Sequence, residues 1–117
     1  MNNNRIFLSL SQRSGFEEQY IQEALASNWM TTGGPNVDAF EKGLENYFGN
    51  EVHVGALSSG TAAIHLGLIL LGVKAGDEVL CQSVIFSAWA NPIVYLGATP
   101  IFIDRESESW NLCPVAL

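Results

Sequence analysis

The sequence predicts an α/β fold with parallel strands, and two observations indicate it. From residue 52 onward, short runs typical of strands alternate with runs typical of helices, over 52–57, 62–71, 78–81, 87–96 and 99–103. Parallel strands need a crossover, which is usually a helix, so this alternation favours a parallel sheet. The 117 residues are 48% hydrophobic and only 15% charged, so we also expect much of the surface to be buried against protein.

The start of this alternation divides the chain. We expect residues 1–50 to form an N-terminal arm with helices, and residues 51–117 to form the first part of the α/β domain. The apolar arm at 6–10 is typical of a short strand. Ser14 and Glu17 have the spacing of a capping box, which predicts the start of a helix.

Two amphipathic helices are predicted in the N-terminal part. Apolar side chains recur at helical spacing between residues 16 and 25, and again between residues 37 and 48. Gly49 is the expected stop signal of the second helix. The segment between them, residues 28–35, is predicted as a loop with an embedded tryptophan.

Three expectations concern the α/β part. The helix at 62–71 is apolar nearly all round, so we expect it to be buried on most faces. The acidic segment 104–108 is predicted as a solvated loop. Pro114 suits the first turn of another helix, which would make the chain end where an element begins, as in a truncated protein.

The charge and cysteine content exclude several classes of partner. The net charge of −7 argues against a nucleic acid or an anionic membrane as the partner. Cys81 and Cys113 match no metal-ligand spacing, so we expect free thiols and no metal site. No long apolar run follows the N-terminus, and the most apolar segment, 62–73, is too short to cross a bilayer. We therefore expect a cytoplasmic location.

The segment Ser59-Gly60-Thr61 lies between a strand-like run and a helix-like run, and this arrangement predicts an anion site. The first amides of a helix have no intrahelical partner, and the helix dipole places partial positive charge there. Gly60 lets the backbone approach a ligand closely. A phosphate would suit this site. The alternative is that Ser and Thr simply cap the helix with no ligand present.

Seven segments, in their order and spacing, resemble one family. They are Asn28–Val37, Phe40-Glu41, Ser58–Leu66, Gly76–Val79, Phe86–Ile93, Gly97–Asp104 and Asn111–Pro114. The family is the DegT/DnrJ/EryC1/StrS sugar aminotransferases, which use pyridoxal phosphate. The resemblance implies the N-terminal part of the large domain of a fold type I aminotransferase, a three-layer α/β/α domain that is incomplete in this chain.

The resemblance also implies an activity and partners. Family members typically move an amino group from glutamate to a keto-sugar linked to a nucleotide, for surface polysaccharides or glycosylated metabolites. It implies a homodimer as well. The same fold includes sugar dehydratases that use histidine in place of the catalytic lysine. Other readings are a non-catalytic phosphate-binding α/β module and an inactive truncated product.

The resemblance assigns roles to particular residues. Ser59, Gly60 and Thr61 match the segment that holds the cofactor phosphate, and Phe86 matches an aromatic residue that stacks on the pyridine ring. Thr31, Thr32 and Gly33 match a substrate-binding loop near the dimer interface, with a plain turn as the alternative.

The catalytic lysine that the resemblance requires is expected downstream of Leu117. Lys42 and Lys74 do not match its position and are predicted as surface lysines. We therefore expect the 117 residues alone to carry no catalytic residue for amino transfer.

Overall fold

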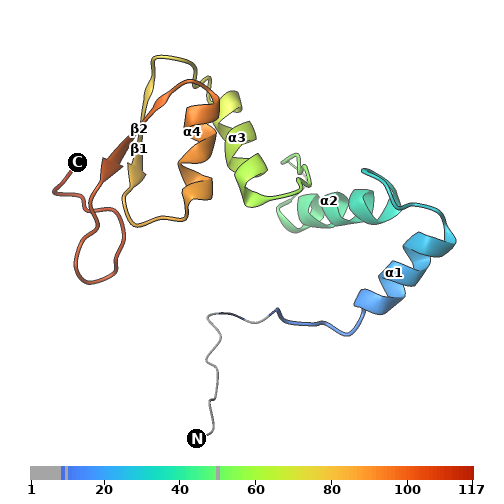
Figure 1. Cartoon of the computed structure of the whole chain (residues 1–117). Coiled ribbons are helices and arrows are strands. Elements are labelled where there is room, and N and C mark those ends of the chain that lie inside the picture. Colours follow the sequence, from blue (N-terminus) through green and yellow to red (C-terminus); the bar gives the residue numbers. More distant parts are fainter. Residues whose placement is uncertain (1–8, 10, 50) are drawn as a thin grey trace, which may run out of the picture. The chain divides into compact units, whose positions relative to one another are not determined.

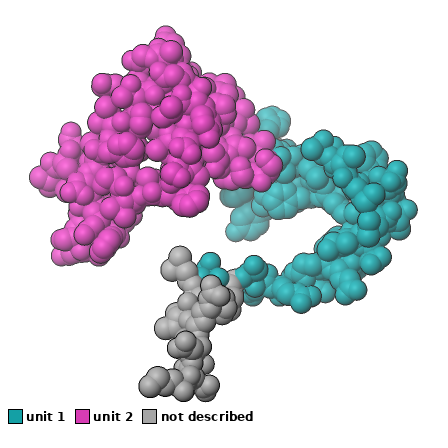
Figure 2. All heavy atoms as spheres, viewed as in Figure 1, with its two compact units in different colours: residues 1–56 teal, residues 57–117 magenta. Residues whose placement is uncertain are grey.

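The chain forms two compact units, which are shown in different colours in Figure 2. The computed structural model describes residues 9, 11–49 and 51–117. Unit 1 comprises the described residues up to Ala56, and unit 2 runs from Leu57 to Leu117. The strand predicted at 6–10 lies outside the described residues, apart from Ser9.

Unit 1 contains the two helices that the sequence predicts, α1 (Glu17–Ala26) and α2 (Pro35–Tyr47), which are labelled in Figure 1. Pro35 occupies the first turn of α2, where a backbone N–H would have no helical partner anyway. Gly49 follows the end of α2 with a φ of 97°. A glycine adopts this left-handed conformation at little cost, so Gly49 ends the helix as predicted.

The predicted capping box at the start of α1 forms only in part. The carboxylate of Glu17 accepts hydrogen bonds from the backbone N–H of Ser14 at 2.6 Å and from its hydroxyl at 3.0 Å. The Ser14 oxygen does not cap the helix; it accepts from the N–H of Phe16 at 3.3 Å, and α1 starts at Glu17. Hydrogen bonds to this carboxylate, above all the one from the Ser14 N–H, lower the pKa of Glu17 from 4.5 to about 2. Glu17 is therefore charged at the positive end of the helix dipole.

The strand predicted at 52–57 is wrong for the described part of the chain. A strand forms only when a second strand pairs with it, and none of the described residues pairs with this segment. Two of its N–H groups instead donate to carboxylates on α2. Val54 donates to Glu45 at 3.4 Å and Ala56 donates to Glu41 at 2.7 Å.

Unit 2 contains the predicted parallel β-α-β arrangement. Helix α3 (Gly60–Leu70) precedes strand β1 (Glu78–Gln82), and strand β2 (Thr99–Ile103) pairs with β1 in parallel, with Leu80 opposite Ile101. These two strands form the one sheet found among the described residues. The alternation of strand-like and helix-like runs thus predicted the direction of strand pairing correctly.

The helix predicted at 87–96 is divided into two short pieces, the 3₁₀ turn η1 (Ser87–Trp89) and α4 (Asn91–Tyr95). Pro92 explains the division, because it has no N–H with which to continue a helical ladder from the preceding turn. It is accommodated near the start of α4, where that N–H is not needed.

The core of unit 2 lies where α4 meets β2 and α3. Its buried side chains are Pro92 and Ile93 on α4, Ala98 in the turn that follows, and Ile103 on β2. Helix α4 packs against both α3 and β2. The rings of His65 on α3 and Tyr95 on α4 meet edge to face, with centroids 5.6 Å apart.

Two further expectations about unit 2 are wrong. Helix α3 is not buried on most faces: no residue of α3 is buried, and Leu70 and Leu71 at its end are 79% and 82% exposed. None of the described elements covers the side chains of Leu70 and Leu71. Pro114 lies in a turn, in which the N–H of Ala116 donates to the carbonyl of Cys113 at 3.2 Å, and not in a helix.

None of the helices in the described part of the chain has the length and apolar character needed to cross a membrane.

Candidate functional site

The start of α3 has the geometry of an anion site. Ser59 is the N-cap residue, and its hydroxyl oxygen accepts a hydrogen bond from the N–H of Ala62 at 3.2 Å. Its carbonyl accepts from the N–H of Ala63 at 3.1 Å. Because the Ser59 oxygen is the acceptor in the cap, the hydroxyl proton remains able to donate to a ligand.

The first two amides of α3 are also available to bind an anion. Among residues 9, 11–49 and 51–117, the N–H groups of Gly60 and Thr61 have no hydrogen-bond acceptor. A Cβ atom built on Gly60 would meet no other atom within 4 Å, so the approach to its backbone is open. The first turn of α3 contains no acidic side chain that would neutralise the helix dipole. These groups together can hold a phosphate.

Phe86 belongs to the same unit and lies in the loop that follows β1. Its side chain is 76% exposed, so its ring is available to a ligand. The Phe86 carbonyl accepts from the N–H of Trp89 at 2.9 Å, which fixes Phe86 at the start of η1, and η1 packs against α3. In Figure 1 the start of α3 and the loop after β1 lie at the same end of unit 2, the lower end as drawn. In parallel α/β folds, ligands bind at the carboxyl ends of the strands.

Thr31, Thr32 and Gly33 belong to unit 1, in the loop between α1 and α2. Thr31 and Gly33 line a groove of about 550 Å³, together with Trp29, Gly34 and neighbouring residues of α1 and α2. Thr32 does not line the groove. A Cβ atom on Gly34 would come within 3.0 Å of the Trp29 ring, and the φ of Gly34 is 118°, so this position requires glycine.

The two lysines lie on the surface of their own units. Lys42 on α2 forms an ion pair with Glu45, with 3.2 Å between Nζ and Oε2, and its side chain is 63% exposed. Lys74 is exposed in the turn before β1, where its backbone N–H donates to Asp77 at 2.9 Å. Both are surface lysines, as the sequence predicts.

The two cysteines both lie in unit 2. Cys81 and Cys113 are free and half-buried. Burial raises the pKa of the Cys81 thiol, so this residue is not a reactive thiolate at neutral pH. Within the part of the chain that the structure describes, no group of three or more potential metal ligands comes together.

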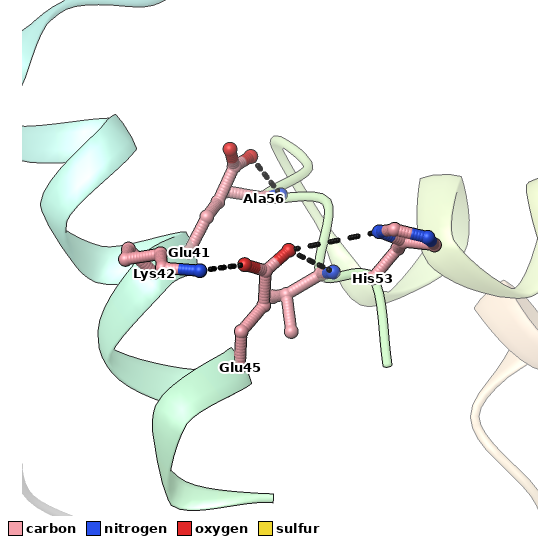
Figure 3. A network of polar contacts seen from close by, with 6 residues as sticks. Glu41, Lys42, Glu45, His53 and Ala56 are labelled. Carbon is pink, nitrogen blue, oxygen red and sulfur yellow. Dashed lines mark hydrogen bonds and ion pairs between the residues drawn. The ribbon is translucent and has the colours of Figure 1, made fainter. Parts of the chain in front are cut away.

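Glu41 and Glu45 were not predicted as functional residues from the sequence. Their carboxylates accept backbone N–H groups of the segment that leads to Ser59, as Figure 3 shows. The available signal was the Phe40-Glu41 pair within the family resemblance. No local sequence pattern predicts the hydrogen bond between Glu41 and Ala56, because the two residues are 15 positions apart in the sequence.

An open helix start in a unit with parallel strands, as at α3 of unit 2, is typical of an α/β protein that binds a phosphorylated ligand. The sequence pattern of the DegT/DnrJ/EryC1/StrS aminotransferase family matches residues 12–117. The chain therefore belongs to this family, as the motifs predict.

Curated relatives give the same result. The chain is 51% identical over 113 residues to EpsN of Bacillus subtilis (strain 168), which is assigned as a pyridoxal phosphate-dependent aminotransferase; the match covers 97% of the chain and 29% of EpsN. It is 39% identical over 102 residues to the GDP-perosamine synthase of Escherichia coli O157:H7, covering 85% of the chain and 27% of that enzyme. The chain thus spans less than a third of the length of these relatives.

Solved structures agree in fold. Spr1654 of Streptococcus pneumoniae, assigned as a sugar aminotransferase and solved in its pyridoxal phosphate form, matches 95% of the chain and 28% of its own length, with 30% identity and a TM-score of 0.81. An E. coli GDP-4-keto-6-deoxy-D-mannose-3-dehydratase with bound hydrated pyridoxal phosphate matches 91% of the chain and 28% of its own length, with 27% identity and a TM-score of 0.77. The chain therefore has part of the fold type I α/β architecture.

The cofactor of this family is pyridoxal phosphate. The described residues fit it, because the start of α3 offers unpartnered N–H groups and an open approach to Gly60. When bound, pyridoxal phosphate supplies an electron sink for bonds broken at the carbon that carries the amino group.

Proposed function

We propose that this chain is the N-terminal, cofactor-binding part of an aminotransferase that moves an amino group from glutamate to a nucleotide-linked keto-sugar. The observation that carries the proposal is the open start of α3, where Ser59, Gly60 and Thr61 present donors to a phosphate. The membership of the family and the sugar aminotransferases among its relatives support the sugar substrate. A homodimer is part of the same proposal.

The chain's own residues would have three tasks. The N–H groups of Gly60 and Thr61 and the hydroxyls of Ser59 and Thr61 would hold the cofactor phosphate. Phe86 would cover one face of the cofactor ring and exclude water from it. Thr31, Thr32 and Gly33 would contact the sugar substrate, and the groove beside Trp29 supports this role for Thr31 and Gly33.

A sugar dehydratase is the second candidate. It is supported by the E. coli dehydratase, whose structure matches the chain with a TM-score of 0.77. The two reactions share the cofactor and differ at the position of the catalytic lysine, which the family resemblance places downstream of Leu117.

The experiment that tests the proposed function uses the product of the complete reading frame that encodes this chain. The purified protein is incubated with glutamate and a panel of nucleotide-linked keto-sugars, and the products are identified by mass spectrometry. We expect 2-oxoglutarate and an amino sugar in equal amounts. A product that lacks a hydroxyl group and contains no new nitrogen would favour the dehydratase. No conversion of any keto-sugar would contradict both candidates.

The ring of Phe86 gives a separate prediction. Replacing Phe86 with Ala is expected to weaken binding of pyridoxamine 5′-phosphate by about tenfold, because a stacked aromatic pair adds about 0.5–1.5 kcal/mol beyond the area it buries. Phe86→Tyr keeps the ring and should bind about as well as the natural protein. Isothermal titration of the complete protein measures both. Equal affinities for the Ala and Tyr variants would show that Phe86 does not stack on the cofactor.

A further inference from the structure

We infer that Trp29 is a positioning residue for the loop proposed to contact the sugar substrate, an inference that rests on the proposed function. This loop, residues 30–33, joins α1 to α2 within unit 1 and is called the substrate loop below. The ring of Trp29 lies just before the loop and packs against Gly34, which lies just after it. Trp29 would then act on the substrate through the loop that it closes.

The start of the substrate loop is fixed by the way in which α1 ends. The N–H of Trp29 donates to the carbonyl of Ala24 at 3.0 Å, and the N–H of Asn28 donates to the carbonyl of Leu25 at 3.3 Å. Asn28 has a φ of 59°. These two bonds around a left-handed residue form a Schellman motif, which ends a helix at a defined residue. The backbone of Trp29 is therefore held to α1.

The end of the substrate loop is fixed by the way in which α2 begins. Gly34 is the N-cap residue of α2, and its carbonyl accepts the N–H of Asp38 at 3.0 Å. A Cβ atom built on Gly34 would lie 3.0 Å from Cε3 and 3.2 Å from Cδ2 of Trp29. The backbone of Gly34 therefore lies directly against the ring, and the lack of a side chain at this position lets the two ends of the loop meet.

The substrate loop itself has little support between these ends. Among residues 9, 11–49 and 51–117, no hydrogen bond involves the backbone N–H or carbonyl groups of residues 30–33. Thr31, Thr32 and Gly33 are all exposed. The shape of the loop thus depends on the contact that closes it. Without the Trp29 ring the loop would sample more conformations, and ordering it again would cost conformational entropy.

The groove of unit 1 relates the closed loop to a ligand. Trp29 and Gly34 line this groove together with Thr31 and Gly33 of the substrate loop. Its volume of about 550 Å³ falls in the range of small-molecule sites, roughly 300–1,000 Å³. A sugar in the groove would meet a loop that is already ordered. Contacts that exist before binding weaken the affinity less than contacts that must be ordered on binding.

The test measures sugar kinetics and cofactor binding in the product of the complete reading frame. The probe is the member of a panel of GDP-, UDP- and dTDP-linked keto-sugars that the natural protein converts fastest. Trp29→Ala is expected to raise the KM for this sugar by about tenfold and to change kcat little, because part of the binding free energy would then order the loop. Isothermal titration with pyridoxamine 5′-phosphate should give the Kd of the natural protein, since other residues hold the cofactor.

Three further variants complete the design. Trp29→Phe keeps a ring on the same Cβ atom and should restore most of the natural KM. Gly34→Ala keeps the Trp29 ring but places a Cβ atom 3.0 Å from it, so the ring must shift and the KM should rise as in Trp29→Ala. Gly34→Ala also replaces Trp29→Ala if that variant fails to fold. Tyr47→Ala removes an exposed aromatic side chain at the other end of α2 and should leave the KM unchanged.

The outcomes separate this inference from the proposed function. If the natural protein converts no keto-sugar of the panel, the proposed function fails, and the positioning role fails with it. If the natural protein converts the sugar and Trp29→Ala or Gly34→Ala keeps the natural KM, the positioning role is wrong. An equal loss of affinity for pyridoxamine 5′-phosphate would also overturn it, because that result indicates a general structural role.

Discussion

The 117-residue chain, expressed by itself, is expected to show no cooperative thermal unfolding. The buried side chains of its described part are Pro92, Ile93, Ala98 and Ile103, all in unit 2. Ordering each residue costs about 1–2 kcal/mol of backbone entropy, and burial of apolar side chains must offset that cost. With so few buried side chains, unit 2 lacks the packing that makes unfolding an all-or-none event.

The exposed apolar surface predicts how the isolated chain behaves. Leu70 and Leu71 at the end of α3 and Phe86 before η1 are largely exposed, and exposed apolar patches of this kind promote association. We therefore expect strong binding of an apolar dye and a broad, gradual melting curve. Scanning calorimetry and near-ultraviolet circular dichroism measure this, with the complete reading frame product as the control. A single transition whose calorimetric and van't Hoff enthalpies agree would contradict the expectation.

Replacing Gly60 with Asp is expected to abolish binding of pyridoxamine 5′-phosphate to the complete protein. The new carboxylate would lie beside the phosphate. Two like unit charges about 4 Å apart near a protein surface repel by about 4 kcal/mol, which corresponds to a loss of affinity of about a thousandfold. The same carboxylate stabilises the positive end of a helix by about 0.3–1 kcal/mol, so α3 itself should not be weakened.

The control for this variant is Gly60→Asn, which has nearly the same size and no charge. The structure leaves open space where a side chain at Gly60 would begin, so Gly60→Asn should bind the phosphorylated probe far better than Gly60→Asp. Melting temperatures of the variants establish that both are folded. If Gly60→Asp binds pyridoxamine 5′-phosphate as tightly as the natural protein, the phosphate does not lie at the start of α3.

Features set by neighbouring residues could be predicted from the sequence. The start of α3 is one, because Ser59 caps the helix through an amide only three residues away. The parallel pairing of β1 and β2 is another, since a helix between two strands favours a crossover that leaves them parallel. The stop of α2 at Gly49 likewise needs only the φ of one residue.

Features that depend on distant partners could not be predicted in this way. The apolar run at 52–57 has the composition of a strand, but it forms one only where another strand pairs with it. The contact between Glu41 and Ala56 joins residues 15 apart and leaves no periodic pattern. The exposure of α3 could not be predicted for the same reason. The apolar composition of α3 shows that its surface requires a partner, but it does not show whether the described residues include that partner.

The most direct test of the central claim is a crystal structure of the complete reading frame product with pyridoxamine 5′-phosphate bound. We predict that the phosphate oxygens lie within hydrogen-bond distance of the N–H groups of Gly60 and Thr61 and of the Ser59 hydroxyl. A phosphate bound elsewhere, with these N–H groups facing water or another part of the protein, would contradict the claim.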